Sequence, residues 1–267
     1  MMVLFLTLYY IMYNSHTLYR RFKSKFEPVQ GTQKGLGVDM VYCITMDNRE
    51  EYVRKIMGQM KSEYTIFHAV TPSNLSIVDY MAMSSTYVPY KNPGIYNKPT
   101  RLPLGISFFM CYYDAYTRGY DSIMILEDDI EFKVSIDQLV TTVKEWESTP
   151  CEFMYLGYCH LQCKKAQYTE LTPNVSEVIS DSRIVCNHAT LLKKSVLQKY
   201  CKKYWSLYMT KQNDNILDEF LRKNKIRRCI PPRGYINQNV TTLGSNNDNK
   251  NDNLHTCHTP TNTKLLD

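Results

Sequence analysis

The segment Gly119–Phe132 reads GYDSIMILEDDIEF and is the most informative part of the chain. Its centre, Ser122–Leu126, is a short apolar run typical of a buried strand. Glu127, Asp128 and Asp129 follow without a spacer. Three carboxylates at the end of a buried strand repel one another unless a cation lies among them, and such oxygen ligands suit Mg²⁺ or Mn²⁺. The alternative is a solvated acidic strand end.

Side-chain direction refines this prediction. Side chains alternate along an extended segment, so we expect Glu127 and Asp129 to share one face. Two hard oxygen ligands on one face predict a divalent-metal site, in which a diphosphate fills further coordination positions.

Apolar runs and helical patterns alternate on both sides of this segment. Strands are predicted over residues 38–46, 64–70, 122–126, 153–156, 184–192 and 226–230. Helices are predicted over residues 48–61, 104–118, 136–146, 193–203 and 214–223. This alternation predicts an α/β fold with a mostly parallel sheet flanked by helices. Ligands of such sheets bind at the carboxyl ends of the strands, where the acidic triplet lies.

The composition sets the domain organisation. The 267 residues carry a formal net charge of +6, and 43% of them are hydrophobic, as in globular proteins. We expect one domain over residues 38–244, an apolar-basic segment over 1–37 and a polar, Asn-rich tail over 245–267. The apolar run 1–13 is shorter than the roughly 20 residues that span a bilayer. Membrane association through residues 1–25 and a packed helix both stay open.

Charge and cysteine usage bear on partners and compartment. The mild positive charge suits an anionic small molecule, and the basic run Arg222–Arg228 is either a solvated helix end or an attractor of diphosphate. No nucleic-acid-binding motif accompanies it, so no nucleic-acid partner is expected. The nine Cys include no CxxC pair, which predicts buried reduced thiols. A cytoplasmic location, with membrane association open, is therefore favoured over a lumenal one.

With these features the chain resembles glycosyltransferase family 25, which contains lipopolysaccharide and procollagen galactosyltransferase-like enzymes. The resemblance covers roughly residues 38–245, and its most specific part is GYDSIMILEDDIEF, which is similar to the family's strand and acidic metal motif. The other similar segments are VYCITMDNREEYVRKI (41–56), FHAVT (67–71), LPLGISFFMCYYDAY (102–116), CNHATLLKKSVLQKY (186–200) and QNDNILDEFL (212–221).

The resemblance implies a GT-A-type fold and metal-dependent, inverting transfer of a hexose from a UDP-sugar to a hydroxyl group on a glycan or protein. It implies that Asp129 and Glu127 contact Mn²⁺ or Mg²⁺. Donor-binding roles are implied for Thr45, Asp47, Arg49, Val70, Ser107, Glu127, Asp128 and His188. For Asp47 and Arg49 the alternative is ordinary helix capping and a solvated side chain, and for His188 it is a buried core position.

Inverting transfer needs a general base near the acceptor hydroxyl. Asp214 and Asp218 are spaced i, i+4 on one face of a predicted helix, and the resemblance favours Asp214 as the base. The alternative for Asp214 is a carboxylate that complements the helix dipole.

Two positions depart from the family pattern. Ser107-Phe108 stands where the family shows Ser-His, and Thr71 stands where it often has an acidic residue. A catalytically inactive glycan- or protein-binding module with the same fold is therefore the alternative function. A metal-dependent phosphoryl-transfer enzyme is a third, which requires further carboxylates at other strand ends.

Overall fold

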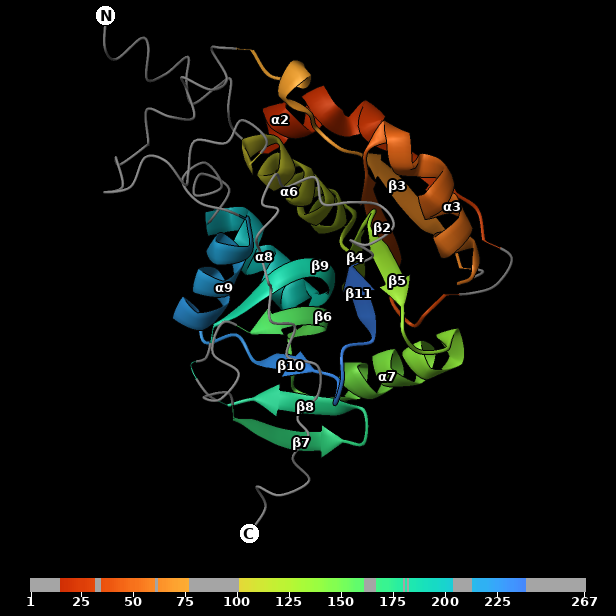
Figure 1. The fold of residues 1–267 in the computed structure, drawn as a ribbon. Coiled ribbons are helices and arrows are strands. Elements are labelled where there is room, and N and C mark those ends of the chain that lie inside the picture. Colours follow the sequence, from red (N-terminus) through yellow and green to blue (C-terminus); the bar gives the residue numbers. More distant parts are fainter. Residues whose placement is uncertain are drawn as a thin grey trace, which may run out of the picture.

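The computed structural model describes residues 15–31, 35–60, 62–76, 101–160, 167–179, 181, 183–203 and 213–238. The predictions for residues 1–13 and 245–267 lie outside this part. The main sheet has nine strands in the order β1-β3-β2-β4-β9-β6-β10-β8-β7. A separate two-stranded sheet joins β5 to β11 (Figure 1).

The strand bounds confirm most of the sequence prediction. Strands that were predicted are β2 (Met40–Thr45), β3 (Tyr64–His68), β4 (Ser122–Glu127), β6 (Phe153–His160), β9 (Ile184–Lys193) and β10 (Arg228–Ile230). Strands that were not predicted are β1 (Phe26–Val29), β5 (Ile130–Phe132), β7 (Tyr168–Thr172), β8 (Val175–Val178) and β11 (Ile236–Gln238).

The prediction of a mostly parallel sheet is wrong. Only β2 with β3, β2 with β4, and β6 with β10 are parallel pairs in the described sheet. β9 runs antiparallel between β4 and β6, and both sheet edges, β1 and the β7–β8 hairpin, are antiparallel. An apolar run shows that a strand is buried and carries no information on its direction, which is why the sequence prediction failed here.

Helices cover both faces of this sheet, so the fold has three layers, with the sheet in the middle (Figure 1). On one face α2 (Ser15–Phe22), α6 (Arg101–Arg118), α8 (Lys194–Lys203) and α9 (Asn213–Lys223) share a core with the sheet. On the other face α3 (Glu50–Gly58) and α7 (Ile136–Ser148) build a second core around Trp146. The short 3-10 turns are η1 (Lys23–Lys25), η2 (Asp47–Arg49) and η3 (Pro72–Asn74).

The ends of α7, α6 and α3 show how local sequence starts and stops these helices. The Ser135 side chain accepts a hydrogen bond from the Gln138 N–H at 3.2 Å and caps α7. Gly119 has a φ of +76° directly after α6, the left-handed conformation that ends helices. Asn48 and Glu51 have the spacing of a capping box, but the structure forms none there. The turn η2 precedes α3, and the N-cap of α3, Arg49, makes no side-chain cap bond.

Residues N-terminal to the expected domain join the same fold. β1 pairs with β3, and Leu18 and Phe22 of α2 are buried. The Tyr19 and Tyr42 hydroxyls both donate to the buried Asp114 carboxylate on α6. Residues 15–31 therefore pack against the same sheet and helix. Within the described residues, no helix combines the length and apolar character that crossing a bilayer requires.

The cysteines differ from their expected state. Cys151 and Cys229 form a disulfide, with their Cα atoms 6.1 Å apart, and Cys186 is also disulfide-bonded. Cys43, Cys111 and Cys201 are free and buried, as expected. The expectation of reduced thiols throughout is wrong because the parallel pairing of β6 with β10 brings together two cysteines 78 residues apart. The cysteine count thus no longer argues for a cytoplasmic location.

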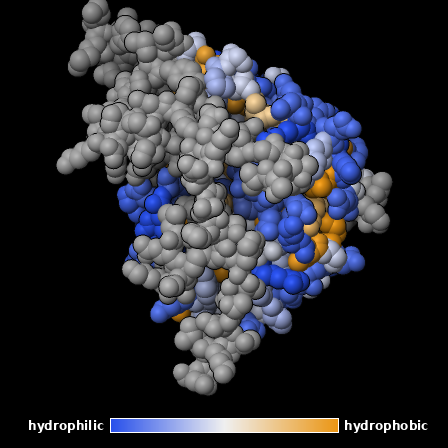
Figure 2. All heavy atoms as spheres, in the orientation of Figure 1, coloured by the Kyte–Doolittle hydropathy of each residue, from blue (hydrophilic) through white to orange (hydrophobic). Residues whose placement is uncertain are grey.

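The described surface on the side shown in Figure 2 is mainly hydrophilic. Hydrophobic atoms appear in small groups, chiefly near β5 and α7 (Figure 2). There the side chains of Phe132, Val134 and Ile136 are only partly buried against the second core.

Candidate active site

The acidic triplet lies where β4 ends. Glu127 is the last residue of β4, opposite Ile44 of β2, and Asp128 and Asp129 form the turn into β5. Because these two residues form a turn, the alternation expected for an extended segment does not describe them. β11 pairs with β5, with Gln238 opposite Ile130, and fixes the turn from its other side.

Asp128 is a buried structural anchor. Its Oδ1 accepts a hydrogen bond from Arg49 Nη1 at 2.9 Å, and its Oδ2 accepts one from the Met46 N–H at 2.8 Å. Asp128 and Arg49 are both buried. The contact joins the first strand-to-helix turn to the acidic turn. Arg49, expected beside a diphosphate, therefore lies in an ion pair, and its Nη1 is also 3.7 Å from Asp129 Oδ2.

Asp129 and Glu127 are less closely paired with a cation than Asp128 is. Asp129 is buried, and its Oδ1 has no hydrogen-bond partner within the described part of the chain. Burial, together with the Asp128 charge, raises the pKa of Asp129 to about 6. Burial also raises the pKa of Glu127 well above its usual range, and the charges of Asp129 and Asp214 add to this shift. The edge of the sheet thus holds carboxylates that nearby cations do not fully compensate.

The two candidate bases on α9 have different surroundings. Asp214 lies in the first turn of α9, and its Oδ2 accepts a hydrogen bond from the Cys186 N–H at 3.4 Å. Its effect on the pKa of Glu127 places its charge near the acidic edge. Asp218 instead accepts hydrogen bonds from Arg222 Nε at 2.9 Å and Arg228 Nη1 at 3.2 Å. The carboxylate oxygens of Asp218 are thus already engaged by two guanidinium groups, which argues for Asp214.

Val70 and Ser107, expected in the donor site, bind each other. The Val70 N–H donates to Ser107 Oγ at 2.9 Å, and Ser107 Oγ donates to the Pro103 carbonyl at 2.9 Å. Both residues are buried. This link fixes the start of α6 to the end of β3, and the Ser107 hydroxyl is engaged as both donor and acceptor.

The other residues of the expected donor turn differ in exposure. Thr45 is buried at the end of β2, and its Oγ1 donates to the Met46 carbonyl at 3.0 Å. Asp47 is exposed, with its Oδ1 3.4 Å from His68 Nδ1. Of these two side chains, only Asp47 is open to solvent.

His188 is a buried, neutral histidine. Burial lowers its pKa to about 4, and its Nε2 lies 2.9 Å from the Ile236 carbonyl oxygen. A carbonyl only accepts, so Nε2 carries the proton and Nδ1 is left as an acceptor, without a partner among the described residues. A side chain at Gly157 would overlap both His188 and the Ile236 carbonyl, so only glycine fits there.

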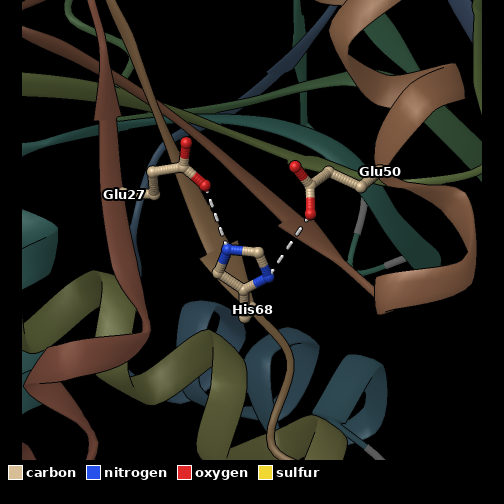
Figure 3. A group of neighbouring side chains, drawn as sticks. All are labelled: Glu27, Glu50 and His68. Carbon is tan, nitrogen blue, oxygen red and sulfur yellow. Dashed lines mark hydrogen bonds and ion pairs between the residues drawn. The ribbon is translucent and has the colours of Figure 1, made fainter.

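A second cluster, which the sequence did not predict, joins Glu27, Glu50 and His68 (Figure 3). Their ligand atoms lie within 4.8 Å of one another, the only such group found in the described residues. Glu27 Oε2 is 3.1 Å from His68 Nε2, and Glu50 Oε2 is 4.0 Å from His68 Nδ1. Arg54 Nη2 lies 2.6 Å from Glu27 and 2.7 Å from Glu50, so a guanidinium already neutralises this cluster.

Comparison with known proteins defines the class. Residues 39–217 match the sequence model of glycosyltransferase family 25 (LPS biosynthesis protein), a range that begins at β2 and includes the acidic turn and Asp214. This match places the chain among the glycosyltransferases. The chain belongs to glycosyltransferase family 25, as its motifs predicted. No curated protein sequence matches it.

Proposed function

We propose that this protein is a metal-dependent, inverting glycosyltransferase of GT-A type. It moves a hexose from a UDP-sugar to a hydroxyl group of a glycan or protein. The observation that carries the proposal is the group of incompletely compensated carboxylates, Glu127, Asp129 and Asp214, at one sheet edge. The family membership supplies the reaction class.

The carboxylates fit a divalent cation. Asp129 offers a buried oxygen without a partner in the described part of the chain. Burial raises the pKa of Glu127, and the charges of Asp129 and Asp214, which a bound cation would offset, raise it further. Asp129 and Glu127 would hold Mn²⁺ or Mg²⁺, since both metals prefer oxygen ligands. The bound ion would supply charge neutralisation for the departing diphosphate. Diphosphate oxygens and water would complete the coordination of the ion.

The remaining residues bind, orient and accept a proton. Arg49 and Asp128 fix the first strand-to-helix turn. The exposed Asp47 would lie beside the uridine, and the buried Thr45 would support the turn at the end of β2. The acceptor oxygen attacks the anomeric carbon as the bond from that carbon to the diphosphate breaks, with inversion, and UDP leaves. Asp214 takes the proton of the acceptor hydroxyl. The Cys186 N–H orients this carboxylate.

The test compares Asp129→Asn with Glu131→Gln. Glu131 is a matched control because it lies two residues further on, has a side chain that is 45% exposed and pairs with Lys133 at 2.7 Å. We expect UDP to bind wild-type protein with Mn²⁺ present, and UDP to be released from one of UDP-galactose, UDP-glucose or UDP-N-acetylglucosamine. Asp129→Asn should lower this turnover by about 10²-fold or more, and Glu131→Gln should leave it unchanged. If neither UDP nor any of these sugars shifts the melting temperature with Mn²⁺ present, the proposal is wrong.

A catalytically inactive binding module is the second candidate, and Phe108 favours it. This residue stands where the family pattern has His, and it is completely buried against Tyr112, with ring centroids 6.3 Å apart. The position therefore contributes packing and no polar group. Binding of a UDP-sugar without any release of UDP, with a full panel of hydroxyl acceptors present, would support the module and contradict the enzyme.

A further inference from the structure

Two buried carboxamides near the acidic edge have no hydrogen-bond partners. Asn187 is 1% exposed and Asn213 is 3% exposed. Neither the oxygen nor the nitrogen of either side chain meets a partner in the described part of the chain. An amide group can make up to four hydrogen bonds, and a buried polar group that makes none is costly and uncommon in native proteins.

Both amides lie next to one contact between β9 and α9. The Cys186 N–H donates to Asp214 Oδ2, Asn187 follows Cys186, and Asn213 precedes Asp214. The antiparallel register of β4 with β9 pairs Leu126 with Ala189, and its continuation places Asn187 beside the acidic turn. Asn213 therefore borders the candidate base, and Asn187 lies between that contact and the acidic turn.

Helix capping does not explain Asn213. It is the first residue of α9, next to the N-cap position at which asparagine side chains commonly accept a backbone N–H. Its Oδ1 accepts no such bond. The amide is thus available to a ligand.

We propose that Asn187 and Asn213 bind hydroxyl groups of the hexose that is transferred, and so set which hexose the enzyme accepts. This assignment rests on the proposed function. A sugar hydroxyl both donates and accepts, so it satisfies the oxygen and the nitrogen of an amide, whereas a diphosphate only accepts. A site that hydrogen-bonds a substrate hydroxyl strongly rejects an analogue lacking it, because its buried polar groups then stay unpaired.

The test uses Asn187→Ala, Asn213→Ala and the control Asn224→Ala. Asn224 follows the other end of α9, and its Nδ2 donates to the Phe220 carbonyl at 2.8 Å. For Asn187→Ala and Asn213→Ala we expect a UDP affinity within twofold of wild type with Mn²⁺ present. We expect kcat/KM for the preferred UDP-hexose to fall at least tenfold, and the preference between UDP-galactose and UDP-glucose to narrow. Asn224→Ala should keep that preference.

Stability separates binding from structure. Loss of an unpaired amide should leave the melting temperature of the ligand-free protein unchanged or raise it. A lower melting temperature with an unchanged donor preference would show that the amides are structural and overturn the assignment. Equal losses of UDP and UDP-hexose affinity would overturn it as well. If wild-type protein itself fails to bind UDP with Mn²⁺, the proposed function is wrong, and the assignment is withdrawn with it.

Discussion

Two carboxylate clusters lie along the same edge of the sheet, and they differ in how fully arginine side chains neutralise them. The first, Glu27, Glu50 and His68, lies at the end of β3, and the second, Glu127, Asp129 and Asp214, lies at the end of β4. Both strands run parallel to β2, which separates them. The first has the tighter grouping of ligand atoms, within 4.8 Å (Figure 3). Proximity alone would therefore select the first cluster as the ligand site.

Charge compensation selects the second cluster. In the first, hydrogen bonds from Arg54 lower the pKa of Glu27, as expected for a carboxylate that already has its cation. In the second, the guanidinium of Arg49 binds Asp128 and lies 3.7 Å from Asp129. Burial, together with the neighbouring carboxylates, still raises the pKa values of Glu127 and Asp129. A group of acids that lacks a full counter-charge is a better indicator of a missing ligand than a group of acids in contact.

The largest effect is expected from removal of Arg49. Arg49→Met leaves Asp128 buried without its guanidinium, and unfolding free energies typically fall by about 3–5 kcal/mol when one partner of a buried pair is removed. Urea denaturation of metal-free protein measures this loss. Added Mn²⁺ should restore part of it, because the same edge then regains positive charge. A loss below about 1 kcal/mol would show that Arg49 does not compensate this edge.

The next largest effect is the pH dependence of the free energy of unfolding, to which His188 contributes. Its folded pKa of about 4 lies below the unfolded value of about 6.5. The unfolded chain therefore binds a proton first as the pH falls, and the free energy of unfolding decreases from about pH 6.5 to pH 4. The total loss is of the order of 3 kcal/mol, with no contribution above pH 6.5.

Denaturation of wild type and His188→Gln across this range measures the contribution. The variant lacks the titrating ring, so its stability should fall less steeply between pH 6.5 and 4 than that of wild type. Parallel curves for the two proteins would contradict a buried neutral histidine.

Sequence alone predicted the centre of the sheet well. Apolar runs over β2, β3, β4, β6 and β9 report burial, which is a local property of the chain. The outer and smaller strands were missed because their burial comes from tertiary contacts. β7 carries exposed residues, and β1 contains Pro28. The Cys151–Cys229 bond likewise depends on a strand pairing that no spacing reveals.

For the site, sequence predicted the acids without their individual environments. It found Glu127–Asp129 and Asp214, but it did not show that Asp128 binds Arg49 or that Asp218 binds two arginines. These pairings depend on side-chain geometry between distant segments. Asn187 gives no signal in the sequence, because an isolated asparagine has no pattern. Only its burial without partners makes it a candidate.

The smallest effect on stability is expected in the first cluster. Arg54→Met removes a guanidinium that is 38% exposed, and exposed ion pairs typically contribute about 0–1 kcal/mol. The change should nevertheless alter binding, because Glu27, Glu50 and His68 then lose their internal cation. Nitrogen and carboxylate ligands at this spacing suit Zn²⁺. We expect calorimetric titration to detect Zn²⁺ binding to Arg54→Met and none to this cluster in wild type.

The double variant Arg54→Met/His68→Gln is the control. It also lacks the guanidinium of Arg54, and in addition it lacks the nitrogen ligand of His68. Zn²⁺ affinity should disappear in it, while Mn²⁺ binding at the β4 edge stays as in wild type. If wild type and Arg54→Met bind Zn²⁺ equally through His68, then Arg54 does not neutralise this cluster, and charge compensation is not what distinguishes the two groups of acids.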